Sequence, residues 1–413
     1  MAAKTERSLI WSWALYDWAN SAFATTVIAG FFPLFFKQYW AADLPALDST
    51  AILAYSNSIA AIFLAITSPV FGAIADEGRL RKRMLFIFTL MGVACTCWLA
   101  FIGQGEWLTA AWAYSLAVFG FTAGLTFYDS LLVQIVKPKN FDRVSGFGYA
   151  LGYLGGGILF AVNVWMYLKF GTDGVRWSFL SVAVWWLLFS LPLFLNIPEP
   201  GHGRRPPFIT SAARGFSSLK KYFKQLRRDK KLFYFLLGYL FYIDGVNTIV
   251  KMAVDYGLSI GLESTDLIKA LLLVQFIGFP SAVAFGYFGE KLGPFKGIWL
   301  CLITYFGITI FSYFIETSLQ FYILAAIIGV VQGGIQSLSR SSYARLVPPE
   351  HSAEYFGFFN MVGKFSAILG PLLVAGVGSA LNNSRAGILV LVVFFIAGGA
   401  FLTYSQQFKA RNT

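Results

Sequence analysis

Long apolar stretches recur along the whole chain and are separated by short polar segments. A helix needs about 20 apolar residues to cross a bilayer, and twelve stretches are long enough, with approximate bounds of 9–37, 51–75, 84–103, 107–136, 144–169, 176–197, 232–257, 266–289, 296–315, 319–347, 354–380 and 386–405. A transmembrane barrel would instead show short segments of alternating hydrophobicity. The pattern therefore predicts an all-α membrane protein with twelve transmembrane helices.

The composition leaves no room for a soluble domain. Hydrophobic residues make up 57% of the chain and charged residues only 13%, about half the charged share of a soluble protein. The net charge of +12 could suggest a nucleic-acid partner, but the basic residues cluster in alternate loops. The positive-inside rule reads this distribution as an orientation signal, with both termini in the cytoplasm of a bacterial-type inner membrane.

One segment interrupts the apolar pattern and divides the chain. Residues 198–231 contain four prolines and then a basic, partly amphipathic stretch from Arg214 to Lys231. We read this segment as a cytoplasmic linker with a helix that lies on the anionic inner leaflet. It separates an N-terminal half of six spans, residues 1–197, from a C-terminal half of six spans, residues 232–413.

A short polar signature occurs in both halves. Asp17 and Asn20 lie in the first span, and Asp244 and Asn247 lie in the seventh, with the same spacing of three residues. This spacing places each pair on one helix face. A carboxylate at membrane depth is costly, so two at matching places suggest one central site built by an internal repeat. The alternative is a hydrogen bond between helices that involves the nearby Asn.

Three further charges inside predicted spans are candidate site residues. Asp129 in span 4 and Arg340 in span 10 are separated by the same offset of 211 residues that relates Pro138 to Pro349. They are predicted to form an ion pair between the halves, either as part of a site or gate or as a structural staple. Lys364 in span 11 is a further candidate, with the alternative that it is a partner for one of the acids.

The residues give no support for enzymatic chemistry. Both histidines, His202 and His351, fall in predicted loops, and all three cysteines fall in spans. No nucleotide-binding glycine–lysine motif is present. We therefore expect no enzyme activity, no metal site and no cofactor, and we expect no transport energy from ATP bound by this chain.

Several motifs resemble a known family. Gly72-x-x-x-Asp76 follows span 2, and Gly286-x-x-x-Glu290-x-x-Gly293 follows span 8, like the loop motif of the major facilitator superfamily, although Glu77 replaces its usual basic residue. More closely, the chain resembles the unknown-major-facilitator family, related to autophagy-related vacuolar amino-acid effluxers. The motifs that carry this likeness are Tyr16-Asp-Trp-Ala-Asn-Ser-Ala-Phe23, Leu151-Gly-Tyr-Leu-Gly-Gly-Gly157 and Gln336-Ser-Leu-Ser-Arg-Ser-Ser-Tyr-Ala-Arg345.

The resemblance implies a fold and two gates. The fold would be two pseudo-symmetric six-helix bundles, with spans 1, 4, 7 and 10 around a central cavity. Asp76 and Glu290 would lie at cytoplasmic corners, near the N-termini of spans 11 and 5 respectively, where a helix dipole favours an anion.

These observations lead to a functional hypothesis. We expect a monomeric secondary transporter that exports an amino-acid-like zwitterion by alternating access, with protons as the coupling ion. Two alternatives remain: proton-driven efflux of hydrophobic amines, and a membrane receptor or scaffold that transports nothing.

Overall fold

The structure, a computed structural model, describes residues 5–199, 210–211, 213, 228–381 and 383–408. Within these ranges the regular structure is entirely helical. The helices are α1 (Glu6–Ala22), α2 (Phe32–Phe35), α3 (Ala46–Gly78), α4 (Arg81–Leu99), α5 (Trp107–Ile135), α6 (Phe141–Asn196), α8 (Lys230–Ser259), α9 (Ser264–Leu292), α10 (Pro294–Tyr313), α11 (Ser318–Ala344), α12 (Ser352–Ala380), α13 (Ser384–Leu389) and α14 (Leu391–Gln406), with π-helical turns at Phe23–Phe31 and Phe36–Trp40 and 3₁₀ turns at Pro138–Asn140 and Pro349–His351.

Every apolar stretch predicted from the sequence coincides with a helical segment to within a few residues. Ten helical segments among the described residues are long and apolar enough to cross a membrane. One of them contains α6, whose 56 residues would reach about 84 Å at 1.5 Å per residue, far more than one crossing needs. Gly171 breaks α6 with a φ of 55° and a ψ of −126°, so α6 carries both predicted spans 5 and 6. The chain is thus an all-α, multi-pass membrane protein.

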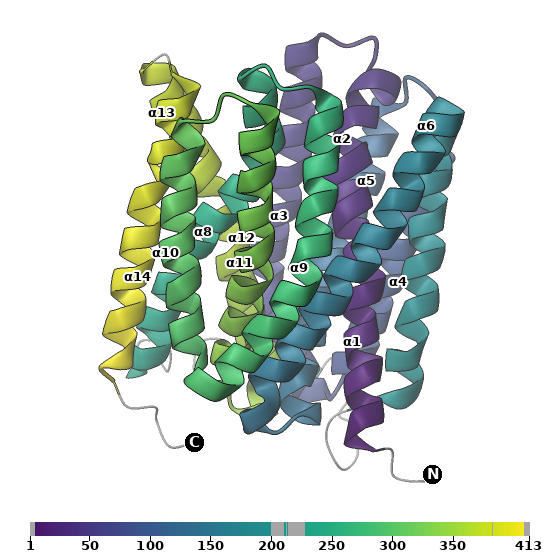
Figure 1. Cartoon of the computed structure of the whole chain (residues 1–413). Coiled ribbons are helices and arrows are strands. Elements are labelled where there is room, and N and C mark those ends of the chain that lie inside the picture. The colour runs from purple at the N-terminus through teal and green to yellow at the C-terminus, as the bar shows by residue number, and fades with distance from the viewer. Residues whose placement is uncertain (1–4, 200–209, 212, 214–227, 382, 409–413) are drawn as a thin grey trace.

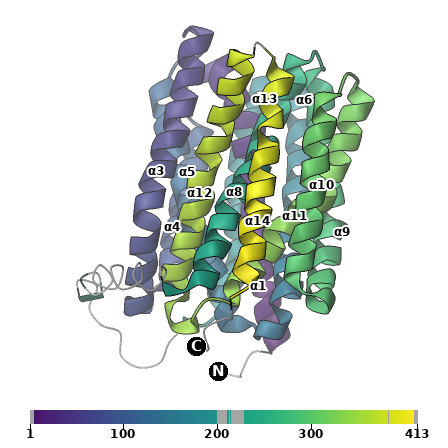
Figure 2. The same cartoon turned by 90° about the vertical axis from the view of Figure 1, so that its left-hand side faces the viewer.

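The helices stand side by side in one upright bundle, and α1 begins at the same end of the bundle at which α14 ends (Figures 1 and 2). We call this the termini end. An even number of crossings is required for that placement. Most of the predicted linker and its surface helix, residues 200–209, 212 and 214–227, lie outside the described part of the chain.

Close backbone contacts join the segments before and after the linker at the termini end. A Cβ on Gly146 of α6 would lie 2.7 Å from the Ala282 carbonyl and 2.8 Å from Gly286 Cα, both in α9. In the matching crossing, a Cβ on Gly357 of α12 would lie 2.7 Å from the carbonyl of Ser68 in α3. Glycine allows such helices to touch. The two crossings close the bundle at its termini end.

Candidate functional site

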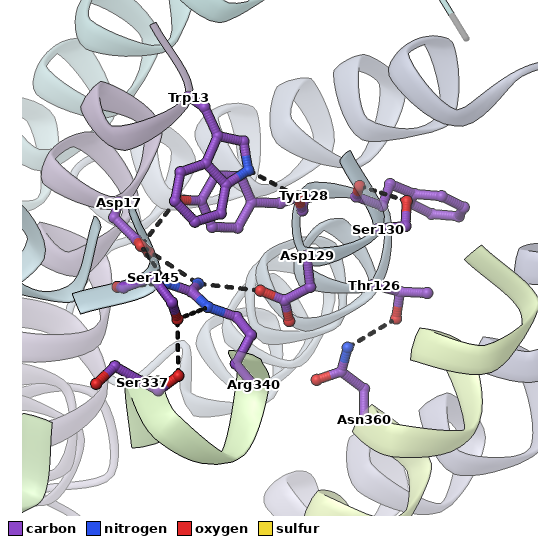
Figure 3. Close-up of polar contacts among 11 residues, drawn as sticks. Trp13, Asp17, Thr126, Tyr128, Asp129, Ser130, Ser145, Ser337, Arg340 and Asn360 are labelled. Carbon is purple, nitrogen blue, oxygen red and sulfur yellow. Dashed lines mark hydrogen bonds and ion pairs between the residues drawn. The ribbon is translucent and has the colours of Figure 1, made fainter. Parts of the chain in front are cut away.

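The guanidinium of Arg340, in α11, lies at the centre of a buried polar cluster (Figure 3). Arg340 is 2% exposed. Its Nη1 donates to Asp129 Oδ1 of α5 at 3.1 Å, and both Nη1 and Nη2 lie 3.4 Å from Asp17 Oδ2 of α1. The predicted pairing of Asp129 with Arg340 is therefore present, and Asp17 shares the same guanidinium.

Ser145, near the start of α6, completes the coordination of the guanidinium. Arg340 Nε donates to Ser145 Oγ at 2.9 Å, and Nη2 donates to the Ser145 carbonyl at 3.0 Å. Ser145 Oγ in turn donates to the Ser337 carbonyl of α11 at 2.8 Å. Buried polar groups are costly unless they are hydrogen-bonded, and here the buried cation has partners on three helices from the segment before the linker.

Three aromatic rings surround the cation. The guanidinium carbon of Arg340 lies 4.2 Å from the ring centre of Tyr149, 4.8 Å from Trp13 and 5.6 Å from Tyr128. The Tyr128 hydroxyl donates to Asp17 Oδ2 at 2.8 Å, and Trp13 Nε1 donates to the Tyr128 carbonyl at 3.0 Å (Figure 3). Aromatic faces attract cations, so the rings hold Arg340 while Tyr128 orients Asp17.

The cluster has more acidic than basic groups. Asp17 and Asp129 share one guanidinium, so the three side chains carry a net charge of −1 when both acids are ionised. An uncompensated buried charge is unfavourable, and one bound proton would make the cluster neutral. The arrangement can therefore exchange a proton, or exchange one carboxylate partner of Arg340 for another.

The structure does not bring Asp244 into contact with Asp17, Asp129 or Arg340 among the described residues, so the single site predicted for Asp17 and Asp244 remains a prediction. Asp244, in α8, is fully buried, and both of its carboxylate oxygens accept from the Gly370 N–H of α12, at 3.0 and 3.1 Å. Thr248 donates to it at 3.3 Å. Pro371, the residue after Gly370, has no N–H of its own to donate, but α12 continues through it from Ser352 to Ala380. All of these residues belong to the C-terminal part of the chain.

The remaining predicted site residues have few contacts. Asn20 is buried, and its Nδ2 has no hydrogen-bond partner among the described residues. Asn247 and Lys364 are half-buried. The described part of the chain contains no ion pair between Lys364 and an acid, so the structure does not show the pairing that was the alternative for this lysine, and its place in a site remains a prediction.

The sequence reasoning missed four members of the cluster: Trp13, Tyr128, Ser145 and Tyr149. One signal was available, because Tyr precedes Asp in both Tyr16-Asp17 and Tyr128-Asp129. A hydroxyl beside a carboxylate within an apolar span is a natural donor to it. In the structure the donation runs between helices, from Tyr128 to Asp17.

Asp76 lies at the corner where α3 meets α12. Its carboxylate accepts from the N–H groups of Ala353 and Glu354, at 3.2 and 2.8 Å, in the first turn of α12. Arg81 donates to Asp76 and also to the Glu350 carbonyl at 2.6 Å. The carboxylate therefore lies at the helix N-terminus that the resemblance implied. Its gating role remains a prediction.

The opposite corner differs from expectation. Glu290 is exposed, and the structure shows no hydrogen bond or ion pair to it among the described residues. The N-terminus of α6 instead has its own buried acid, Asp142, which accepts two hydrogen bonds from Arg345 of α11, at 2.8 and 2.7 Å. Because Asp142 already provides the anion there, Glu290 does not cap α6. Gly293, at the end of α9, has a φ of +87°, which a glycine adopts without strain.

His351 also lies closer to acids than its predicted loop position suggested. Ligand atoms of Asp76, His351 and Glu354 lie within 4.8 Å of one another and could hold a metal ion. The Asp76 carboxylate, however, already binds Arg81 and two N–H groups of α12. These contacts explain the grouping as a helix cap without a metal.

Gly148 provides a test of the Arg340 cluster. A Cβ at Gly148 would lie 2.7 Å from Asp17 Oδ2, 2.9 Å from the Trp13 ring and 3.2 Å from Arg340 Nη2. We expect Gly148→Ala to force these groups apart, to destabilise the protein by about 1–3 kcal/mol and to abolish transport. Gly307→Ala is the matched control, because nothing lies within 4 Å of the added methyl group. Thermal unfolding of both variants checks this, and equal unfolding temperatures would contradict it.

Asp76 provides a test of the corner. Asp76→Asn should weaken the hold on α12 by about 1–3 kcal/mol, because a carboxylate bound to Arg81 and two N–H groups loses its charge. Cysteines introduced at Gln134 and Glu350 can report opening, since the Gln134 amide donates to the neighbouring Pro349 carbonyl at 2.7 Å. In a background without native cysteines, cross-linking should fall several-fold. Glu290→Gln should leave it unchanged, and an equal yield in both variants would mean that the corner is ordinary packing.

Comparisons with known proteins agree on one group. The family model described as "Vacuole effluxer Atg22 like" matches residues 44–140 and 134–413. An "Uncharacterized MFS-type transporter YxiO" of Bacillus subtilis is 36% identical over 405 residues, which cover 96% of this chain and 94% of that protein. "Autophagy-related protein 22" of Yarrowia lipolytica is 28% identical over 67% of this chain, and the match spans only 52% of that longer protein.

Solved structures show the same fold at low identity. The human organic anion transporter MFSD10 superposes with a TM-score of 0.73 at 18% identity, covering 97% of this chain and 100% of that one. The proton:xylose symporter XylE gives a TM-score of 0.70 at 12% identity, covering 97% and 94%. At these identities the two comparisons show that the chain shares the helical fold of these two transporters.

Proposed function

This chain belongs to the family described as "Vacuole effluxer Atg22 like" and is a transporter of the major facilitator superfamily, and from this premise we propose that it exports a small amino-acid-like zwitterion in exchange for protons. Three particulars are proposed here: the solute, the coupling ion and the alternation of access between two halves, residues 1–197 and 232–413.

The observation that carries the proposal is the position of Arg340. This residue lies after the linker, whereas both of its carboxylate partners, Asp17 and Asp129, lie before it. If the two halves separate during transport, these ion pairs must break or be replaced. A solute carboxylate can replace them, since the planar guanidinium binds carboxylates through two parallel hydrogen bonds.

The same cluster suggests how a zwitterion is recognised. When a solute carboxylate binds to the guanidinium of Arg340, either Asp17 or Asp129 loses its ion pair. That acid can accept the ammonium group of the solute or a proton. Competition between solute and proton for the cluster would couple the two movements, because each changes the charge that the other meets.

Asp244 is a second candidate position for the coupling proton. It is fully buried, and its contacts are the Gly370 N–H, beside Pro371 in α12, and the Thr248 hydroxyl. An ionised carboxylate inside a membrane span is costly, so this acid is a candidate position for a bound proton. A proton at Asp244 would loosen the α8–α12 contact from within one half.

The closed termini end supports alternating access. Asp76 binds the start of α12 at one corner, and Asp142 binds Arg345 at the other. We assign this closed end to the cytoplasmic side, from the basic loops and the placement of both termini. Opening toward the cytoplasm would require both corners to break.

The alternative of a hydrophobic amine as the solute is less well supported by the geometry. The aromatic rings that could bind an organic cation, Trp13, Tyr128 and Tyr149, already surround Arg340. An amine would have to displace a cation that also has two ion pairs. The other alternative, a receptor or scaffold that transports nothing, gives no reason for a buried cluster with two acids and one cation.

A ligand screen tests the proposed solute class. Purified protein would be heated with amino acids, hydrophobic amines and short peptides, and ligand binding to the folded state would raise the unfolding temperature. We expect stabilisation by amino acids that is lost in Arg340→Lys. Stabilisation by amines alone would favour the alternative solute class.

A further inference from the structure

A lateral groove lies at the termini end of the bundle, between α1, α6 and α9. Its volume is about 670 Å³. In the lower part of Figure 1, α6 lies between α9 and α1, and these three helices supply nearly all of the residues that line the groove. The Arg340 cluster contributes no residue to its lining.

The groove is polar at its rim and apolar farther into the membrane. Arg7 lies in the first turn of α1, and Arg143 lies in the first turn of α6. Trp11, Phe147 and Phe279 line the deeper part, about one and a half to three and a half helical turns from the ends of their helices. Trp11 is 44% exposed although it lies within a predicted span, and its ring meets Phe147 edge to face at 4.8 Å.

The rim carries positive charge in a fixed place. The guanidinium of Arg143 lies 4.9 Å from the ring centre of Tyr287 in α9, and this cation–π contact orients it. Glu6 is also at the rim, so the two arginines and this glutamate leave a net charge of +1. A basic rim can bind a phosphate group, and the apolar part of the groove can hold the acyl chains attached to it.

We propose that this groove binds one anionic phospholipid from the membrane leaflet that faces the termini. Arg7 and Arg143 would bind the phosphate, and the acyl chains would lie over Trp11, Phe147 and Phe279. Basic pockets between transmembrane helices recognise anionic head groups in this way. The lipid would contact α1 and α6 from one half and α9 from the other, so it would stabilise the closed form.

The inference does not depend on the proposed solute, because binding can be measured without transport. Full-length protein would be delipidated in detergent and then given phosphatidylglycerol, phosphatidylcholine, or glycerol phosphate without chains. Native mass spectrometry would count the retained molecules, and thermal unfolding would report stabilisation. We expect one retained phosphatidylglycerol, at least tenfold less phosphatidylcholine, and no effect of glycerol phosphate.

Three variants locate the site. The double change Arg7→Gln with Arg143→Gln should reduce retention of phosphatidylglycerol at least tenfold. Val283→Trp should also reduce it, by filling the groove without changing its charge. Lys296→Gln, which removes a positive charge from an exposed position of α10 outside the groove, should leave retention unchanged.

Several results would overturn the proposal. Retention at wild-type level in both the arginine double variant and Val283→Trp would place the lipid elsewhere. Equal retention of phosphatidylcholine would show an apolar groove without charge recognition, and equal stabilisation by glycerol phosphate would show a soluble phosphate site. If the double variant fails to fold, retention of phosphatidylglycerol is measured in Val283→Trp and in the single variant Arg143→Gln, and wild-type retention in both would overturn the proposal.

Discussion

Arg340→Lys is expected to insert and fold but to transport about 100-fold more slowly than the wild type, a change in barrier of about 2.7 kcal/mol. Lysine keeps the positive charge but has no fork that can bind two carboxylates at once. It would lose the contacts with Ser145 and at least one of the two ion pairs. Transport in reconstituted vesicles and the unfolding temperature together separate lost recognition from lost stability.

The control for this variant is Arg385→Lys, at the other end of the bundle. Arg385 is partly exposed, and its Nη1 donates to the Tyr313 carbonyl at 3.3 Å and lies 3.9 Å from Glu316 Oε1. A lysine can make both of these contacts. The variant should transport nearly as well as the wild type. If Arg340→Lys also transports normally, the Arg340 cluster is a structural staple and the solute binds elsewhere.

Asp17→Asn is expected to abolish uphill transport while solute exchange continues at a rate within about threefold of the wild type. The amide resembles a protonated carboxyl, so it can still accept from Tyr128 but can no longer release a proton. The Arg340 guanidinium keeps Asp129 as its partner. Folding should be close to normal, because the cluster becomes neutral.

Asp129→Asn and Asp244→Asn complete the comparison and show which acid carries the proton. The variant that loses accumulation but keeps exchange identifies the coupling residue. Asp244→Asn should show this phenotype only if the Gly370 site binds the proton. If all three variants accumulate solute normally, none of these acids couples transport.

The sequence predicted the fold well because apolar length and charge placement decide it. Each predicted span coincides with a helical segment to within a few residues, and α1 begins at the same end of the bundle at which α14 ends, as the alternating basic loops predict. The offset that relates Asp129 to Arg340 predicted their contact correctly, since equivalent positions in repeated halves face each other across the axis that relates them. The ion pair at 3.1 Å is the result.

The partner of Asp244 could not be predicted, because it depends on how two helices are rotated against each other. The sequence shows an acid in span 7 and Gly370-Pro371 in span 11, but spacing along the chain does not show that they meet. The backbone N–H of Gly370 donates to both carboxylate oxygens of Asp244. The two copies of the Asp-x-x-Asn signature therefore have different partners: the acid of the first copy contacts Arg340, and the acid of the second contacts the backbone of α12.

The contacts of Glu290 could not be predicted for a different reason. Its motif matches that of Asp76, and Gly286 makes the close contact with α6 that the motif requires. Glu290 has no hydrogen bond or ion pair among the described residues, whereas Asp142 lies in the first turn of α6 and binds Arg345. The loop motif predicts where the backbones of two helices approach each other. It does not predict which carboxylate lies at the start of the second helix, because that helix can supply its own acid, as α6 does with Asp142.

The most direct test of the proposed mechanism is proton movement driven by the solute. Vesicles containing the purified protein and a pH-sensitive dye would be given the amino acid identified by the ligand screen. The account predicts a pH change in wild-type vesicles that is absent in Asp17→Asn and Arg340→Lys, and solute accumulation that a protonophore abolishes. Accumulation that persists with a protonophore, without any pH change, would contradict proton coupling through the Arg340 cluster.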